Sequence, residues 1–221
     1  MKMDAQTTEK YFDREFWKTE NRRYLEPHFR LEKAARLLNG MAAGRPKRLL
    51  DIGCGPAALA TLLDSNIDYR GIDIALQAQA PFLRELDFVK HPIPADGAPF
   101  DFIVASGLFE YMGRMQPDKF KEVHDLLAPD GCFLVSYINF EHPRKVISAL
   151  YNNLRPIAEF RKELEGCFVV ERSFPVSYNW EGTPPRRGWL KQLEMPLNFN
   201  IPVLAKRFAV EYFFICRRPG R

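Results

Sequence analysis

Long apolar runs are missing from this sequence. No apolar stretch among its 221 residues reaches the roughly 18 to 20 residues that a bilayer crossing requires. The first residues, Met-Lys-Met-Asp-Ala-Gln, also lack the apolar core of a signal peptide. We therefore expect a cytoplasmic protein without a transmembrane segment.

Cysteine and histidine are scarce, with four residues of each. The cysteines at positions 54, 132, 167 and 216 form no CxxC pair, and the histidines are not clustered. This spacing argues against a structural metal site and against a disulfide framework. We expect free thiols and no bound metal, with most of the cysteines packed as small hydrophobic side chains.

Neither sign of charge dominates, because 32 Lys and Arg residues stand against 28 Asp and Glu residues, a net charge of +4. Residues 155–221 hold 12 basic residues against 7 acidic ones. This bias could attract an anionic substrate or a membrane surface. Since no long basic run occurs, a solvated surface is the simpler interpretation.

Between residues 45 and 140, short apolar runs alternate with helical patterns. Repeated strand–helix units of this kind predict a parallel sheet joined by right-handed crossovers. Pro81 argues against a regular helix around it, since proline lacks a backbone N–H. The predicted strands cover 48–52, 69–74, 87–90, 100–105 and 132–138, and the predicted helices 57–63, 75–85 and 117–128.

The two ends of the chain depart from this alternation. The segment between the last two predicted strands carries Pro184, Pro185, Pro196 and Pro202, so we expect an elaborated loop there, with one short helix. The expected elements are helices over 7–18 and from Pro27 to Gly40 or Gly44, strands over 167–174 and 209–216, and a short helix near 189–193.

The chain length and its 46% of hydrophobic residues predict a single domain over residues 1–221. No internal repeat or interdomain linker interrupts the sequence. Within the domain we expect an N-terminal helical lid over 1–44, a cofactor-binding core over 45–140, and substrate-side elements with the C-terminal strands over 141–221.

A glycine loop follows the first predicted strand of the core. The strand runs into Gly53-Cys54-Gly55-Pro56, and Asp73 closes the next strand about twenty residues later. This is the layout of a nucleotide half-site in a doubly wound α/β fold. The glycines allow close approach of the backbone to a ligand, and the later carboxylate can accept both ribose hydroxyls.

Two residues beside this loop bear on which cofactor it binds. The pattern Gly53-x-Gly55-x-x-Ala58 also satisfies the dinucleotide fingerprint, which leaves an NAD(P)-dependent oxidoreductase open. Asp51, however, suits a cationic group such as the amino group of S-adenosyl-L-methionine and ill suits a pyrophosphate. Pro56 also removes a backbone N–H where a pyrophosphate would bind. Together they favour S-adenosyl-L-methionine.

Four sequence blocks in order resemble the class I S-adenosylmethionine-dependent methyltransferases. The resemblance implies a Rossmann-like, doubly wound, mostly parallel seven-stranded sheet with an antiparallel last strand. It also implies N-terminal helices, an insertion between the last two strands, and S-adenosyl-L-methionine as cofactor. The resemblance is good over residues 45–140 and looser elsewhere. The blocks are 49–56 (LLDIGCGP), 71–74 (GIDI), 100–111 (FDFIVASGLFEY) and 127–136 (LAPDGCFLVS).

The same resemblance implies the cofactor contacts. Asp51 would orient the methionine amino group, Asp73 would bind the ribose hydroxyls, and Ile74 would pack on the adenine. The family often has an acidic residue after the third strand, where this chain has His91, so adenine recognition falls to His91 or to backbone atoms. The implied cofactor-binding residues are Asp51, Gly53, Cys54, Gly55, Asp73, Ile74, His91, Ser106 and Leu108.

Methyl transfer from a sulfonium needs alignment and exclusion of water more than it needs a catalytic triad. A general base is required only when the acceptor must lose a proton early. The candidate groups follow the fourth and fifth strands, where open α/β sheets bind ligands. His142 is the first choice as base, with an exposed loop histidine as the alternative, and Glu110 and Tyr111 are the other candidates.

Two variable segments, residues 7–24 and 177–206, are rich in aromatic side chains with a few cations. They favour a small apolar or aromatic methyl acceptor with an O, N or C nucleophile. A homodimer interface, a peripheral membrane contact, and a non-catalytic cofactor-binding or membrane-associated protein stay open. Residues 106–109 lack the (Asp/Asn)-Pro-Pro-aromatic motif of amino-directed base methyltransferases, which argues against nucleic acid as substrate.

Overall fold

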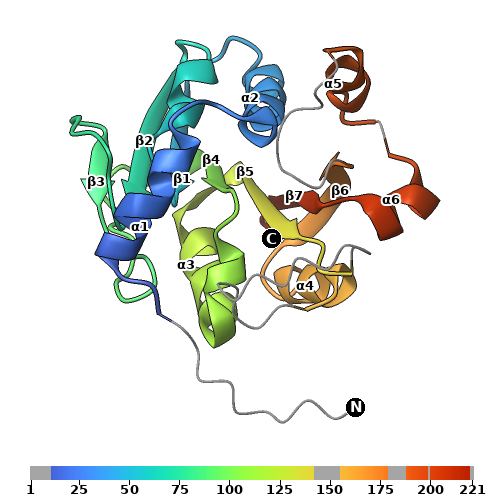
Figure 1. Cartoon of the computed structure of the whole chain (residues 1–221). Coiled ribbons are helices and arrows are strands. Elements are labelled where there is room, and N and C mark those ends of the chain that lie inside the picture. The colour runs from blue at the N-terminus through green and yellow to red at the C-terminus, as the bar shows by residue number, and fades with distance from the viewer. Residues whose placement is uncertain (1–10, 142–154, 179–187, 199, 220–221) are drawn as a thin grey trace.

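The computed structural model describes residues 11–141, 155–178, 188–198 and 200–219, which form a seven-stranded sheet with helices on both faces (Figure 1). The strand order is β3-β2-β1-β4-β5-β7-β6. Strands β1 to β5 pair in parallel, whereas β7 is antiparallel to both β5 and β6. The predicted doubly wound sheet with a reversed last strand is therefore confirmed. The strands are β1 Lys47–Ile52, β2 Ile67–Asp73, β3 Leu83–Glu85, β4 Phe100–Ala105, β5 Leu127–Ile138, β6 Val169–Ser177 and β7 Glu211–Arg217.

The order of the strands determines where a ligand can bind. From β1 the chain first builds the sheet outward through β2 and β3, then returns to place β4 on the other side of β1. In open α/β sheets, ligands bind outside the carboxyl ends of the strands at such a reversal. The glycine loop follows β1, and residues 106–111 follow β4, so both lie at this reversal.

The helices agree only partly with the predictions. Helix α2 begins two residues after Pro27 and is followed by the left-handed cap residue Ala43, close to its predicted limits. Pro202 occupies the first turn of α6, where a proline costs no hydrogen bond. The elaborated loop expected over this segment therefore omits a helix that forms. Helix α4 was also not predicted. The helices are α1 Arg14–Glu20, α2 Phe29–Ala42, α3 Gln116–Leu126, α4 Ile157–Leu164, α5 Gly188–Glu194 and α6 Pro202–Phe208.

The segment after β2 corrects the predicted helix over 75–85 and the predicted strand over 87–90. No helix forms there, and residues 83–85 are instead the short strand β3. Pro81 interrupts any helical hydrogen-bond ladder. Asp87 then closes a turn, because its Oδ1 accepts hydrogen bonds from the backbone N–H groups of Val89 and Lys90.

Two smaller corrections concern the segments after β1 and before β5. The predicted helix over 57–63 is a 3-10 helix, η2 (Ala58–Leu62), which follows the left-handed residue Ala57. The strand predicted over 132–138 is longer than expected, because β5 begins at Leu127.

Hydrophobic side chains fill both faces of the sheet. On one face, Phe120 of α3 and Phe160 of α4 pack with the outward side chains of β4 and β5, and the Phe160 and Tyr137 rings stack 3.8 Å apart. On the other face, Leu38 of α2 packs with Leu49 and its neighbours. Alternate residues of β1 enter the two clusters, as the period of two in a strand requires.

A hollow of about 400 Å³ lies on the sheet beside β2 and β3. It is lined by residues including Arg70, Phe82 and Arg84. No crossover helix forms within 74–99, so only loop segments connect β2, β3 and β4. The hollow is lined by the strands themselves and not by the loop that follows β1, so it is distinct from the site described next.

Candidate cofactor and acceptor site

Asp51 lies at the carboxyl end of β1 and is almost fully buried. Its Oδ2 accepts a hydrogen bond of 2.8 Å from the Tyr69 hydroxyl. Burial raises the pKa of Asp51 to about 7, although the Tyr69 hydrogen bond and the Arg30 charge oppose the shift. A carboxylate in such a site is stabilised by a cation that arrives with a ligand. This matches the amino group expected at Asp51.

The glycine loop turns sharply over the ends of β1 and β2. Gly53 and Gly55 have φ angles of 72° and 53°, in the left-handed region that favours glycine. The N–H groups of Gly53 and Cys54 both donate to the Ile72 carbonyl, at 2.8 and 3.1 Å. A Cβ on Gly53 would lie 3.1 Å from Leu108, so the loop and the segment after β4 are in close contact.

Asp73 accepts three hydrogen bonds at the end of β2. Its Oδ2 accepts from the Gly55 N–H at 2.8 Å, and its Oδ1 accepts from the Ala75 N–H at 2.8 Å and from the Asn21 side-chain amide at 3.1 Å. Asn21 comes from the 3-10 helix η1 (Asn21–Tyr24) and is buried. Sequence reasoning did not find Asn21, because it lies 52 residues from its partner.

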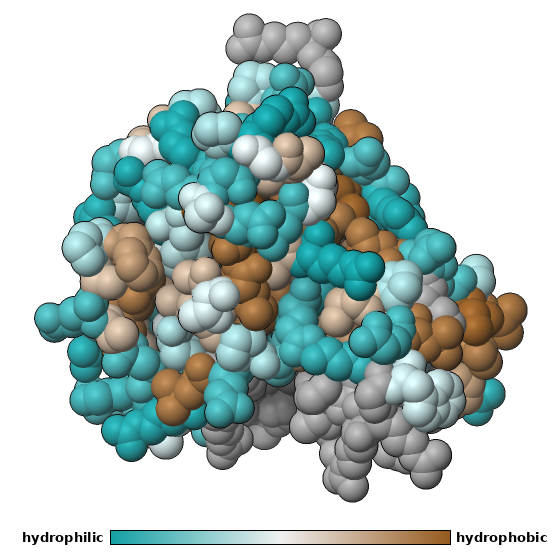
Figure 2. Space-filling view, turned by 90° about the horizontal axis from the view of Figure 1, so that it is seen from above, coloured by the Kyte–Doolittle hydropathy of each residue, from teal (hydrophilic) through white to brown (hydrophobic). Residues whose placement is uncertain are grey.

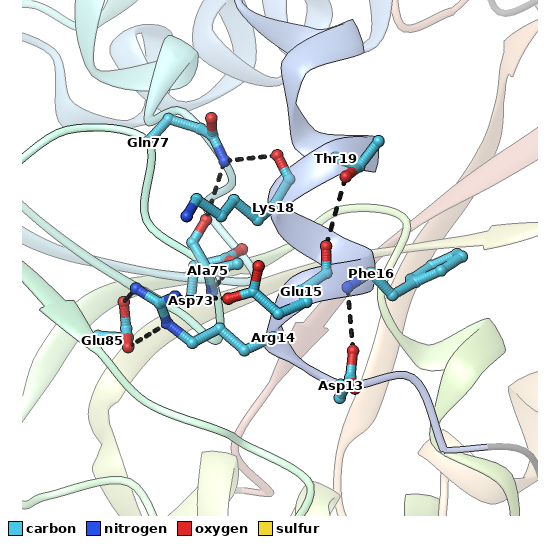
Figure 3. A network of polar contacts seen from close by, with 10 residues as sticks. All are labelled: Asp13, Arg14, Glu15, Phe16, Lys18, Thr19, Asp73, Ala75, Gln77 and Glu85. Carbon is cyan, nitrogen blue, oxygen red and sulfur yellow. Dashed lines mark hydrogen bonds and ion pairs between the residues drawn. The ribbon is translucent and has the colours of Figure 1, made fainter.

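The N-terminal segment crosses the same edge of the sheet (Figure 3). Arg14 of α1 binds both oxygens of Glu85, at 2.7 and 3.0 Å. The Gln77 amide donates to the carbonyls of Lys18 and Ala75. Together these contacts connect α1 to the ends of β2 and β3.

An aromatic cluster joins α1 to the segment after β4. The Trp17 ring meets Tyr111 edge to face, with centroids 4.8 Å apart, and Phe12 lies 6.5 Å from the same tyrosine. The predicted candidate Tyr111 therefore lies beneath the N-terminal segment.

Glu110 is buried in the 3-10 helix η3 (Phe109–Tyr111), which follows β4. Its Oε1 accepts a hydrogen bond of 3.0 Å from the Ile138 N–H, whereas its Oε2 is buried without a partner among the described residues. Burial, with the Glu211 charge as a further cause, raises the pKa of Glu110 to about 8. A buried oxygen without a partner in a native protein calls for an explanation, and a bound ligand is one.

Arg30 links α2 to the start of β7 at this place. Its Nη1 contacts both carboxylate oxygens of Glu211, at 3.0 and 3.2 Å. Gly107 has a φ of 69°, and a Cβ there would lie 2.7 Å from the Arg30 guanidinium. The Arg30 charge opposes the upward pKa shifts of both Asp51 and Glu110, so it lies within electrostatic reach of both carboxyl groups.

His28 lies next to Arg30, 3.5 Å from its guanidinium. Burial and the Arg30 charge lower the pKa of His28 to about 3, which keeps the imidazole neutral. No local sequence motif singles out His28, Arg30 or Glu211. The structure brings all three to the acceptor side of Glu110 only through packing of α2 and β7.

The other predicted site residues lie in different surroundings from one another. Ser106 lies at the end of β4, and its buried hydroxyl has no hydrogen-bond partner in the described part of the chain. The Cys54 side chain instead packs beneath Gly71, where a Cβ would lie 2.8 Å from its sulfur, so only its backbone faces the loop. His91 lies in a loop where its carbonyl accepts from Lys119. His142 falls outside the described residues.

The side chains at this edge fit the methionine end of S-adenosyl-L-methionine. Asp51 offers a buried carboxyl group, the glycine loop exposes backbone, and Ser106 has an unused hydroxyl. Within the described ranges, no group of His, Cys, Asp and Glu side chains could hold a metal ion. In the same ranges, no helix is long and apolar enough to cross a membrane.

Comparisons with known proteins agree with this geometry. A family model described as a methyltransferase domain matches residues 27–173, more than half of the chain. No curated protein sequence matches the chain significantly.

Three solved structures illustrate the likeness of the fold. An S-adenosylmethionine-dependent methyltransferase from Clostridium acetobutylicum has a TM-score of 0.61 at 12% identity, covering 92% of this chain and 99% of that one. The N-methyltransferase NodS from Bradyrhizobium japonicum, in complex with S-adenosyl-L-homocysteine, scores 0.57 at 13% identity over the same shares. The [4+2]-cyclase SpnF scores 0.56 at 19% identity, covering 85% of this chain and 82% of that one. At these identities the likeness concerns the fold alone.

Proposed function

Since this chain belongs to the S-adenosylmethionine-dependent methyltransferases, we propose that it methylates an O, N or C nucleophile of a small, apolar or aromatic molecule. The observation that carries this proposal is the buried Glu110 carboxyl group, which has one oxygen without a partner among the described residues and is followed by Tyr111, the residue that the aromatic cluster covers. A group so enclosed suits an acceptor that fits under the N-terminal segment. The family match gives no support to the NAD(P)-dependent alternative.

We assign the donor side to the ends of β1, β2 and β4. In this assignment Asp51 binds the amino group, Asp73 binds the ribose, and Ser106 donates to the methionine part. S-adenosyl-L-methionine, when bound, supplies a methyl group that the sulfonium has already activated. Leu108 and the glycine loop exclude water from the same place.

We assign the acceptor side to Glu110, Tyr111 and His28. The pKa of about 8 means that Glu110 carries a proton at neutral pH, so it can donate a hydrogen bond from Oε2 to an acceptor atom. In its ionised form the same oxygen can take a proton from the acceptor. The neutral His28 is too weak a base to take a proton at neutral pH, so its role here is to offer an uncharged hydrogen-bonding ring beside Arg30. His142 stays a prediction from the sequence.

Calorimetric titration with S-adenosyl-L-homocysteine tests the donor side, and we expect saturable binding that Asp51→Asn weakens about tenfold or more. Asp101→Asn is the matched control, because Asp101 pairs with Lys47 at the opposite edge of the sheet. Incubation with S-adenosyl-L-methionine and a panel of phenols, amines and carbon acids, read by mass spectrometry, tests the acceptor side. Binding of S-adenosyl-L-homocysteine without any methylated product would indicate a non-catalytic binding protein and contradict the proposal.

A further inference from the structure

Helix α6 leaves almost all of its side chains exposed to solvent. Val203 is 83% exposed, and Leu204 and Phe208 are 43% and 42% exposed, whereas Ala205 is buried. Four of the eleven large apolar side chains that the described part of the chain exposes lie here: Ile201, Val203, Leu204 and Phe208. Figure 2 shows hydrophobic residues gathered at its right edge, the side on which α6 lies in Figure 1. Exposed apolar groups that cluster in this way mark interaction surfaces.

The helix is firmly attached, so its exposure does not come from loose packing. Asn139, at the end of β5, donates to the Ala209 carbonyl at 2.7 Å, and the Ile201 N–H donates to the Tyr178 hydroxyl at 3.3 Å. Ala205 and Ala209 face the protein. Helical periodicity then places Val203 opposite Ala205 and Leu204 to one side, whereas Phe208, three residues after Ala205, lies at the margin of the inward face with its ring partly exposed. We call Ile201, Val203, Leu204 and Phe208 the α6 apolar face.

Both charged side chains of α6 itself are positive. Lys206 and Arg207 are exposed and make no ion pair with any described residue. The acidic side chains of the described part of 188–219 turn inward instead. Glu194 accepts a hydrogen bond from Ser177, and Glu211 pairs with Arg30. The exposed surface of this helix is therefore apolar and cationic, with no exposed acidic residue of its own.

We propose that the α6 apolar face docks on an anionic membrane surface. Apolar side chains beside lysine and arginine are the composition of helices that lie in the interface of anionic bilayers. A second copy fits this face less well, because symmetric pairing would bring Lys206 and Arg207 of both copies together. Since α6 leads directly into Glu211, docking would place the bilayer beside the acceptor side of the site. The proposal does not depend on which acceptor is methylated.

Vesicle flotation with the full chain tests this proposal. We expect binding to vesicles of phosphatidylcholine with about 30% phosphatidylglycerol, weak binding to phosphatidylcholine alone, and a loss of binding in high salt. Two double variants, Val203→Glu with Leu204→Glu and Lys206→Glu with Arg207→Glu, should each reduce the partition coefficient about tenfold.

Matched controls separate this surface from general effects of charge and exposure. Val169→Glu replaces one exposed apolar side chain of β6 by a glutamate. Arg36→Glu with Arg45→Glu reverses two exposed charges, one on α2 and one after it. These controls should bind vesicles like the parent chain. Unchanged titration with S-adenosyl-L-homocysteine shows that each variant is folded, whatever the outcome for the methyl acceptor.

Three outcomes would overturn the proposal. One is an absence of flotation with anionic vesicles. Another is equal flotation of the α6 variants and the controls. The third is a homodimer in analytical ultracentrifugation that Val203→Glu with Leu204→Glu dissociates, which would assign the face to a second copy.

Discussion

Single residues at the carboxyl edge of the sheet are held in states that water would not favour. Asp51 and Glu110 are carboxyl groups whose pKa values burial raises to about 7 and about 8, and the His28 pKa is lowered to about 3. All three are thereby biased toward their neutral forms in the ligand-free protein. Strongly perturbed groups that gather in one place are typical of functional sites.

The raised pKa of Asp51 predicts that binding of S-adenosyl-L-homocysteine depends on pH. The cationic amino group favours the ionised carboxylate, so the affinity should fall about tenfold for each pH unit below the pKa of about 7. Titration between pH 5 and 8 measures this, and Asp51→Asn should bind weakly at every pH. An affinity independent of pH would contradict the assigned role of Asp51.

The raised pKa of Asp51 also makes the stability of the ligand-free protein depend on pH. A folded-state pKa raised above the unfolded value means that the folded protein binds more protons between about pH 4 and pH 7, so the free energy of unfolding falls as the pH rises through that range. Asp51→Asn should remove this fall and stabilise the ligand-free protein at pH 8 by about 1–2 kcal/mol. Urea unfolding at pH 5 and pH 8 measures the difference, and a variant less stable at pH 8 would contradict it.

Glu110→Gln removes the titrating proton while keeping the size of the side chain. We expect the variant to bind S-adenosyl-L-homocysteine normally, but to lose about 10²-fold or more in turnover if Glu110 transfers a proton. The parent rate should rise through about pH 8, and the variant profile should be flat there. Glu159→Gln, at an exposed position of α4, is the control. Unaltered kinetics would leave Glu110 as a structural residue.

At the scale of elements, the N-terminal segment is the part that can regulate access. Its contacts with the sheet are mostly exposed, including the Arg14–Glu85 pair, and exposed ion pairs contribute little stability. Its aromatic residues cover Tyr111. Asn21 is its only described residue that binds Asp73, the carboxylate assigned to the ribose.

Asn21 therefore competes with the ribose for Asp73. Asn21→Ala should bind S-adenosyl-L-homocysteine about three- to tenfold more tightly, because about 1 kcal/mol of hydrogen bonding no longer has to be broken. Asn66→Ala, which removes an exposed amide that donates to Arg45, is the matched control. Weaker binding by Asn21→Ala would instead mean that the amide contacts the ligand.

At the scale of the whole molecule, the two faces of the sheet must both be covered for the site to form. Residues from α2, β4 and β7 meet at the acceptor side, and Arg30 and Glu211 are 181 positions apart in the chain. Such a site depends on the helices that cover the two faces of the sheet. On the face opposite α2, the stacking of Phe160 on Tyr137 is the contact that fixes α4.

Phe160→Ala should therefore destabilise the whole domain by about 3–5 kcal/mol, the usual cost of removing a buried phenylalanine. Phe208→Ala, on the α6 apolar face, should cost less than about 1 kcal/mol because that ring is 42% exposed. Denaturant unfolding of both variants gives the comparison. Equal losses would contradict the assignment of Phe160 to the core and Phe208 to the surface.

The sequence by itself predicted the fold class and the cofactor, and it placed the candidate donor-side residues close together along the chain. The glycine loop, Asp51 before it and Asp73 after it are separated by short, local distances along the chain, so their spacing already encodes the geometry of a strand, a turn and the next strand. Strands β1, β2, β4 and β5 were also predictable, since apolar runs bounded by turn residues have few other structures open to them, whereas the strand predicted over 87–90 was wrong. The helix predicted over 75–85 failed where a helical pattern competed with Pro81.

Only the tertiary structure decided the acceptor side. His28, Arg30, Glu110 and Glu211 carry no shared motif, because the packing of α2 and β7 against the sheet, and not local spacing, brings them together. Their charge states likewise follow from burial, which depends on what surrounds each group. The same reason applies to α6, whose apolar residues look like core in the sequence and lie on the surface in the fold.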